Sequence, residues 1–334
     1  MFRNYLKLLL RLMLKQKGFS LINITGLTVG IACSVLIMLY VLDELRYDRF
    51  HQDAPRIFRV GATRVTQGSQ TRTAQTGLPL AEAIRTIDGV ESSLRIAAWK
   101  TFPVTYEDKA FTEQYLILTD PNFFTFFSFN LIEGDPDSVL LGKGKVVITE
   151  SAAQRYFNYR GKGDTSPVGK TLLFAQGSKV TISGVAEDPP VNSHFHFTLL
   201  LSLSPGEPDP EQKEDWLSGL VITYYKLRPG VDASLKGAQV EKELEKYSDL
   251  YLRNVRDPGQ AALTSEADRL RYFIQPLQDI HLKSNLPDEI ETNGSTARIF
   301  LLGMIALFIT LLACINFMNL STAQSSTRAK EIAV

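Results

Sequence analysis

Residues Phe19 to Leu42 read FSLINITGLTVGIACSVLIMLYVL, a run of 24 residues without a charged side chain. An α-helix rises about 1.5 Å per residue, so a helix of this length can cross the ~30 Å hydrocarbon core of a bilayer with some tilt. A core helix of a soluble protein is rarely so long and so uniformly apolar. The sequence therefore predicts a transmembrane helix at residues 19–42.

A second apolar run, Ile299 to Leu320, lies near the end of the 334-residue chain and predicts a second span at residues 299–320. Both cysteines, Cys33 and Cys314, lie inside the spans, so the soluble domain predicted at residues 43–298 has no disulfide. A cleaved leader is the alternative for the first run. It is disfavoured because a leader has a shorter apolar region and a small-residue cleavage site.

The charges predict how the chain crosses the membrane. Residues 1–18 carry +5, residues 321–334 carry +1 and the whole chain is neutral, which leaves −6 for residues 43–298. Because short basic flanks of a span stay in the cytoplasm, both ends are predicted to be cytoplasmic and the middle to face outward. The neutral balance argues against a nucleic-acid partner, which needs a basic face.

The N-terminal segment, residues 1–18, has a basic stripe. Arg3, Lys7, Arg11 and Lys15 recur every four residues among leucines, which predicts an amphipathic helix lying on the lipids of the inner leaflet. The alternative interpretation is a simple basic anchor for a terminus that faces inward.

Each predicted span has a face of small residues that would let another helix approach closely. These helix-packing residues are Gly26, Gly30 and Ser34 in the first span and Ala306, Thr310 and Cys314 in the second. Asn316 and Asn319 are polar residues inside the second span, and we expect both to face protein because facing lipid is costly. The two faces suggest further spans as partners.

The region between the spans is predicted to be a mixed α+β domain. β-branched and alternating segments predict strands at residues 57–66, 90–106, 111–118, 146–148, 171–174, 180–185, 221–227 and 272–276. Helices are predicted at residues 80–87, 149–156 and 235–252, and loops at residues 204–214 and 253–268. The aromatic residues Phe123, Phe124, Phe126 and Phe127 are expected to pack in a core.

The juncture after the first span is charged, and the helix is predicted to continue as far as Pro55. Asp43, Glu44, Tyr47 and Asp48 are the candidate residues for transmitting movement between span and domain; the alternative is an ordinary solvated juncture.

No motif for catalysis is found. Gly169-Lys170-Thr171 lacks the earlier glycine of a phosphate-binding loop at the required spacing. His194 and His196 would share a face in a strand and could pair on a metal, but surface or core histidines are the simpler interpretation. We expect no enzyme activity, no cofactor and no metal.

Four segments together resemble the MacB/FtsX-type ABC transporter permeases. They are the opening FRNYLKLLLRLMLKQKGFSLINITGLTVGIACSVLIMLYVLDELRYDRFH, then GVAEDPPVNSHF, QPLQDIHL and the terminal LLACINFMNLSTAQSSTRAKEIAV. The last segment is the most specific, because Asn316, Asn319, Arg328, Lys330 and Glu331 match the family pattern there.

The resemblance implies a permease of the bacterial inner membrane whose MacB-like periplasmic core has a porter-like part (about 56–147 and 215–280) and a β-rich sabre-like part (about 148–214). It implies a separate cytoplasmic ABC ATPase that contacts Arg328, Lys330 and Glu331 in a coupling segment at residues 321–334. It also implies a second permease subunit, or a second half of the same chain, and a periplasmic or outer-membrane partner. The motif is cut at Val334, so further spans are expected after it.

The expected role is export, including efflux, or mechanotransmission to the envelope. One alternative is a two-span sensor with an external ligand-binding domain. The other is an FtsX-like scaffold that regulates a cell-wall hydrolase.

Overall fold

The structure is a computed structural model that describes residues 17–66, 69–174, 177–203, 216, 219–254 and 269–332. The predicted amphipathic helix lies outside these residues except for its last two, and so do the loop at 204–214 and nearly all of the loop at 253–268. The chain divides into two compact units. One is formed by residues 1–46 and 294–334, and the other by residues 47–293.

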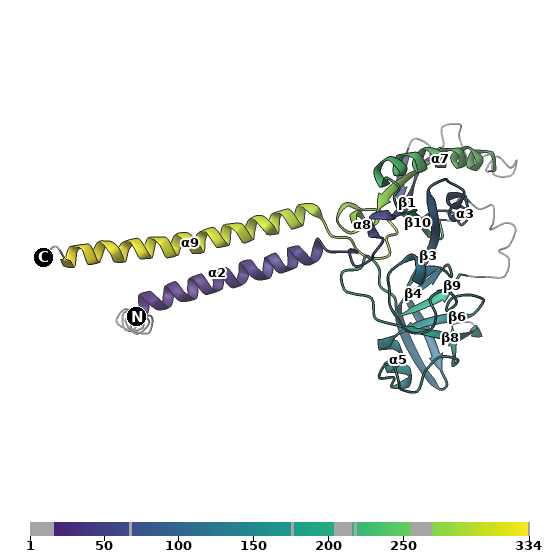
Figure 1. Ribbon diagram of the computed structural model, residues 1–334, viewed down its shortest axis with the longest axis horizontal. Helices are drawn as coiled ribbons and strands as arrows, with labels where there is room; N and C mark the ends of the chain where they lie inside the picture. Colours follow the sequence, from purple (N-terminus) through teal and green to yellow (C-terminus); the bar gives the residue numbers. More distant parts are fainter. Residues whose placement is uncertain are drawn as a thin grey trace. The chain divides into compact units, whose positions relative to one another are not determined.

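The first unit, here called the helical unit, contains two long antiparallel helices, α2 (Lys17–Glu44) and α9 (Thr296–Ile332), which pack side by side (Figure 1). Both are long and apolar enough to cross a membrane, over Leu21–Glu44 and Thr296–Asn319. Helix α9 continues beyond its apolar part, so residues 321–332 extend the same helix.

The second unit, here called the outer domain, is mixed α and β. Its strands are β1 (Ile57–Thr66), β2 (Ser69–Thr73), β3 (Val90–Tyr106), β4 (Lys109–Thr119), β5 (Leu131–Glu133), β6 (Lys145–Thr149), β7 (Thr171–Phe174), β8 (Lys179–Ala186), β9 (Leu199–Ser202), β10 (Ile222–Leu227) and β11 (Arg269–Pro276). Its helices are η1 (Ala54–Arg56), α3 (Leu80–Arg85), α4 (Phe123–Phe126), α5 (Glu150–Phe157), α7 (Ala233–Asn254) and α8 (Leu277–Lys283).

These strands form one 11-stranded sheet in the order β11-β1-β10-β3-β4-β9-β6-β8-β5. Strand β2 pairs with β1, and β7 pairs with both β3 and β8. The pairings β3-β4-β9-β6-β8-β7-β3 therefore close into a ring of six strands. Each strand of the ring therefore has a hydrogen-bonded neighbour on both sides over part of its length.

Most predicted elements are confirmed. Thr149 caps α5 by accepting a hydrogen bond from the Ala152 amide, as its position before the helix predicts. The four phenylalanines at 123–127 are buried and share the central core with Phe129, Phe195 and Phe197. Strands β2, β5 and β9 and helices α4 and α8 were not predicted, because short elements carry little periodic signal.

The predicted helical continuation to Pro55 is wrong. Helix α2 ends at Glu44, and residues 45–50 form turns. Asp48 has a left-handed backbone conformation, with φ of 58°, which no α-helix accommodates. The chain therefore enters the outer domain as an irregular segment that is held by its side chains.

The division into porter-like and sabre-like parts stays a prediction. The predicted boundary at residue 147 falls within β6, and strands from both parts belong to the same sheet.

Candidate functional site

Two segments of the outer domain connect it to the helical unit along the chain. Connector 1 is residues 47–56, between α2 and β1, and connector 2 is residues 277–293, after β11. A loop at residues 187–198, between β8 and β9, contacts both connectors. All four histidines of the chain lie in these three segments.

Asp48 of connector 1 is completely buried. Its Oδ1 atom accepts a hydrogen bond from the backbone amide of His194 at 3.0 Å and lies 2.8 Å from Nδ1 of the same residue. The other ring nitrogen of His194 lies 2.9 Å from the hydroxyl of Tyr224 on β10. A buried carboxylate is costly without such partners, so this chain of contacts fixes connector 1 to the loop and to the sheet.

Connector 1 also carries Tyr47, whose ring stacks on His281 of α8 with centroids 3.4 Å apart and planes 3° from parallel. Since α8 belongs to connector 2, this stack joins the two connectors directly.

His51 is the second buried titratable residue of connector 1. Its Nδ1 accepts a hydrogen bond from the Ser128 amide at 3.1 Å, and its ring packs on Phe127 and Phe129. Burial lowers the pKa of His51 to about 3, so the ring is neutral at ordinary pH.

Asp53 links connector 1 to the sheet. It pairs with Arg56 and lies 3.2 Å from Nζ of Lys226, a buried lysine on β10. The same ammonium group donates to the carbonyl of Thr125 at 3.1 Å. Lys226 therefore joins connector 1, β10 and the segment around α4.

Connector 2 is held by a buried ion pair between Arg59 of β1 and Glu289. The Arg59 side chain is 1% exposed, and its Nη2 lies 3.0 Å from Oε1 of Glu289. The guanidinium also donates to Gln275 at 2.6 Å and to Ser284 at 2.9 Å. These partners satisfy the planar fork of donors that arginine presents.

A second pair on connector 2 joins Glu291 to His196 of the loop. Oε1 of Glu291 lies 2.8 Å from Nδ1 of His196 and accepts from its backbone amide at 2.5 Å. The hydrogen bond to Glu291 raises the pKa of His196 above its usual value.

These contacts follow one pattern. Each connector contributes carboxylates, and the body of the domain contributes the basic or hydrogen-bonding partners: His194, His196, Arg59 and Lys226. Removing one partner of a buried pair typically costs about 3–5 kcal/mol, so each connector is held rigidly where it enters the domain.

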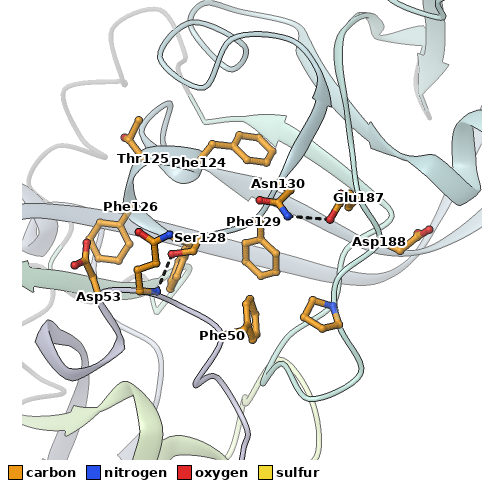
Figure 2. Close-up of a pocket in the computed structure, with 13 residues that line it drawn as sticks. Phe50, Asp53, Phe124, Thr125, Phe126, Ser128, Phe129, Asn130, Glu187 and Asp188 are labelled. Carbon is orange, nitrogen blue, oxygen red and sulfur yellow. Dashed lines mark hydrogen bonds between the residues drawn. The ribbon is translucent and has the colours of Figure 1, made fainter. Parts of the chain in front are cut away.

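A groove of about 670 Å³ lies beside connector 1, lined by residues that include Phe50, Asp53, Glu187 and Asp188. Figure 2 shows the hydrogen bond between Asn130 and Glu187 across part of it. Asp188 accepts from the hydroxyl of Ser151 at 2.6 Å, and Asp53 pairs as described above. The three carboxylates thus already have protein partners.

The histidine pair considered for a metal is divided between the two connectors. His194 contacts Asp48 and His196 contacts Glu291. In the part of the chain that the structure describes, no group of three metal-ligating residues is found. Gly169 lies in a turn before β7, with φ of 89°, and no helix follows as a phosphate-binding loop requires.

The small residues of the two spans meet each other inside the helical unit. A Cβ atom on Gly30 would lie 2.9 Å from that of Ala313, and the hydroxyl of Ser34 donates to the Ala306 carbonyl at 3.1 Å. Thr310 donates to Ser34 at 2.9 Å.

Other residues of these predicted faces lie differently. A Cβ on Gly26 would lie 3.3 Å from the amide nitrogen of Asn316, so Asn316 faces α2, whereas Asn319 is exposed. Cys314 is exposed as well, and Ala313 takes the place predicted for it. The face follows the helical repeat of 3.6 residues, and a strict spacing of four drifts away from it.

The remaining predicted residues lie at the ends of the helices. Asp43 and Glu44 form the last turn of α2, while Arg328, Lys330 and Glu331 fall in the extension of α9. Tyr47 and Asp48 are thus the predicted juncture residues that the structure brings into the connector network.

Sequence reasoning considered His194 and His196 only as a metal pair or as surface or core histidines. It missed the other partners in the network, namely Arg59, Lys226, His281, Glu289 and Glu291. One signal was present, because Arg59 is a charged residue between apolar neighbours, Phe58 and Val60, in β1. Its partner lies 230 positions away, and no local pattern identifies it.

Comparisons with known proteins show the family to which the chain belongs. A family model described as the MacB-like periplasmic core domain matches residues 20–246. A comparison with curated proteins finds no match.

Several solved structures are similar. A domain of a putative permease protein from Porphyromonas gingivalis is 27% identical, with a TM-score of 0.54, over 68% of this chain and 91% of that one. The periplasmic region of MacB from Actinobacillus actinomycetemcomitans is 15% identical, with a TM-score of 0.43, over 68% and 91%. The extracellular domain of the noncanonic ABC-type transporter YknZ from Gram-positive bacteria is 15% identical, with a TM-score of 0.39, over 65% and 99%.

Proposed function

Because the chain belongs to the family with a MacB-like periplasmic core domain, carried here between two membrane spans, we propose that it is the permease subunit of an ABC-type complex. In this proposal a separate cytoplasmic ATPase supplies the energy, both ends of the chain are cytoplasmic, and the outer domain moves in the periplasm. The protein itself is not the catalyst.

The observation that best supports this proposal is the fixation of both connectors. A ligand sensor needs a built ligand site, whereas a device that transmits force needs rigid entry points. Asp48 lies two residues after the end of the helical unit at Arg46, and Glu291 lies three residues before that unit resumes at Gly294. Both carboxylates are paired.

The proposed mechanism is a shift between two states of the membrane part, biased by ATP. Closure of the ATPase moves the α9 extension that carries Arg328, Lys330 and Glu331, and the helices change their packing. Because each connector is ion-paired to the sheet, a displacement of either span moves the outer domain as a body. A second permease subunit, or a second half of the same chain, completes the membrane assembly, and this movement drives export or acts on a periplasmic or outer-membrane partner.

The coupling is tested in proteoliposomes that contain the permease and its ATPase. A Gly-Ser-Gly-Ser insertion between Arg46 and Tyr47 should abolish the ATP-dependent change in distance between spin labels on two outer domains, while ATP hydrolysis continues. The same insertion in the turn between β3 and β4, at Glu107 and Asp108, is the control and should preserve the change. An unaltered ATP-dependent change with the first insertion would contradict the proposal.

The contact with the ATPase is tested separately. Alanine at Arg328, Lys330 and Glu331 together should abolish copurification of the ATPase with the full chain. Copurification at the wild-type level would remove this segment from the proposal.

Orientation is tested by cysteine labelling in a Cys33→Ala/Cys314→Ala background. A cysteine at Asp108 should react with an impermeant maleimide in intact spheroplasts, and one at Lys17 only after lysis. The reverse pattern would overturn the proposed topology.

A further inference from the structure

The ring of His196 lies between two oxygen acceptors. On one side Nδ1 is 2.8 Å and 3.0 Å from the two carboxylate oxygens of Glu291. On the other side Nε2 is 3.2 Å from the carbonyl oxygen of Pro190. The side chain is 27% exposed, so protons can exchange with solvent.

This geometry selects one protonation state. A neutral imidazole has a single N–H, so one of its nitrogens would direct a lone pair at an oxygen. The imidazolium has two N–H groups and satisfies both acceptors. His196 in this setting is a cation that is held by a charge-assisted hydrogen bond.

The surrounding groups favour the same state. The charges that act on His196 are those of Glu291 on connector 2 and Asp48 on connector 1, and both are acidic. Strand β4 contributes Tyr115, whose ring centroid is 6.5 Å away. The pKa of His196 is raised, chiefly by the hydrogen bond to Glu291, although burial acts in the opposite direction.

His51 provides the contrast within the same network. Its Nδ1 accepts a hydrogen bond from a backbone amide, which only the neutral ring can do. Of these two histidines, then, His196 is the one whose environment requires the proton.

We propose that His196 and Glu291 form a pH-dependent lock on connector 2, which holds while His196 is protonated and opens when it is not. This inference rests on the proposed function, because the lock regulates the connector through which the second span would move the outer domain. A raised pKa means that the stabilisation is complete below the unfolded value, near 6.5, and is lost as the pH rises through the folded value. Alkaline conditions outside the membrane would loosen the connector.

The test is hydrogen–deuterium exchange of the full chain in detergent at pH 6 and pH 9, with rates corrected for intrinsic exchange. The backbone amide of His196, which donates to Glu291, should lose protection on the order of tenfold between the two values, the loss expected for one charge-assisted hydrogen bond. His196→Gln and Glu291→Gln should each remove this pH dependence. Glu187→Gln, which removes a carboxylate from the same loop, should leave it intact.

The proposal fails if the wild type shows no change in protection, or if His196→Gln shows the same change as the wild type. Either result leaves the proposed transport function untouched, because exchange is measured without ATPase or ATP. Conversely, an insertion that fails to uncouple in proteoliposomes would overturn the function without altering the exchange result.

Discussion

The helical unit and the connectors of the outer domain are stabilised in opposite ways. Helices α2 and α9 meet through small side chains and two interhelical hydrogen bonds made by Ser34 and Thr310. The connectors are fixed by buried charges, with Arg59 and Asp48 almost inaccessible to water. A packing contact between small side chains can rearrange at a lower free-energy cost than a buried ion pair can be separated.

The difference indicates where the molecule can move. Weak, adaptable packing lies between the spans, and strong, directional packing lies where the spans continue into the domain. Substitutions in each region should therefore have effects of different size and on different observables.

Arg59→Met should have the largest effect, because it leaves Glu289 buried without its cation. We expect a loss of about 3–5 kcal/mol in the stability of the outer domain. Tryptophan fluorescence during thermal unfolding measures it. Lys283→Met, which removes an exposed pair with Asp279, is the control and should change nothing measurable. Equal melting temperatures for the two variants would contradict the assigned role of the Arg59 pair.

Asp48→Asn and Asp48→Ala separate charge from backbone conformation. Asparagine tolerates a positive φ and can still accept from the His194 amide, so we expect it to cost about 2 kcal/mol. Alanine loses both features and should cost about 1–2 kcal/mol more. Urea unfolding of the two variants decides the point, and identical losses would show that the conformation at residue 48 is unimportant.

Acid should weaken the outer domain through His51. Its pKa is lowered to about 3 in the folded state, so the stabilisation is present above the unfolded value and is lost as the pH falls. The expected loss is about 2 kcal/mol at pH 5 relative to neutral pH. His51→Gln can still accept from the Ser128 amide and should show a smaller loss on acidification. The same acid sensitivity in this variant would remove His51 as the cause.

Gly30→Leu should act on the spans alone. A side chain there collides with Ala313, and forced overpacking typically costs about 1–3 kcal/mol. Cross-linking between cysteines on α2 and α9 should become slower, while the melting temperature of the outer domain stays unchanged. Val29→Leu, at an exposed position of the same helix, is the matched control.

Ser34→Ala and Thr310→Val should have the smallest effects. Interhelical hydrogen bonds in membranes average about 0.6 kcal/mol, so the same cross-linking rate should change only two- to threefold. A change as large as that of Gly30→Leu would mean that hydrogen bonding, and not close packing, holds the spans together.

The sequence predicted what local patterns encode. Uncharged runs identified both helices of the helical unit, and alternation identified most strands of the outer domain. Asp48 was selected because it lies next to a span, but its burial was not foreseen. The pairing of Asp48 with His194 across 146 positions depends on tertiary folding, which no periodicity of 2 or 3.6 residues records.

The strand order has a consequence for synthesis. Strand β1 pairs with β2 locally, but its other neighbours, β10 and β11, begin at Ile222 and Arg269. The first span is therefore made and inserted long before β1 can be covered on both sides. Until those late strands have been made, the nascent domain exposes an unpaired strand edge and Asp48 has not met all of its partners. Folding of the domain must wait for synthesis of almost the whole segment, and in that interval the chain is most exposed to aggregation and proteolysis.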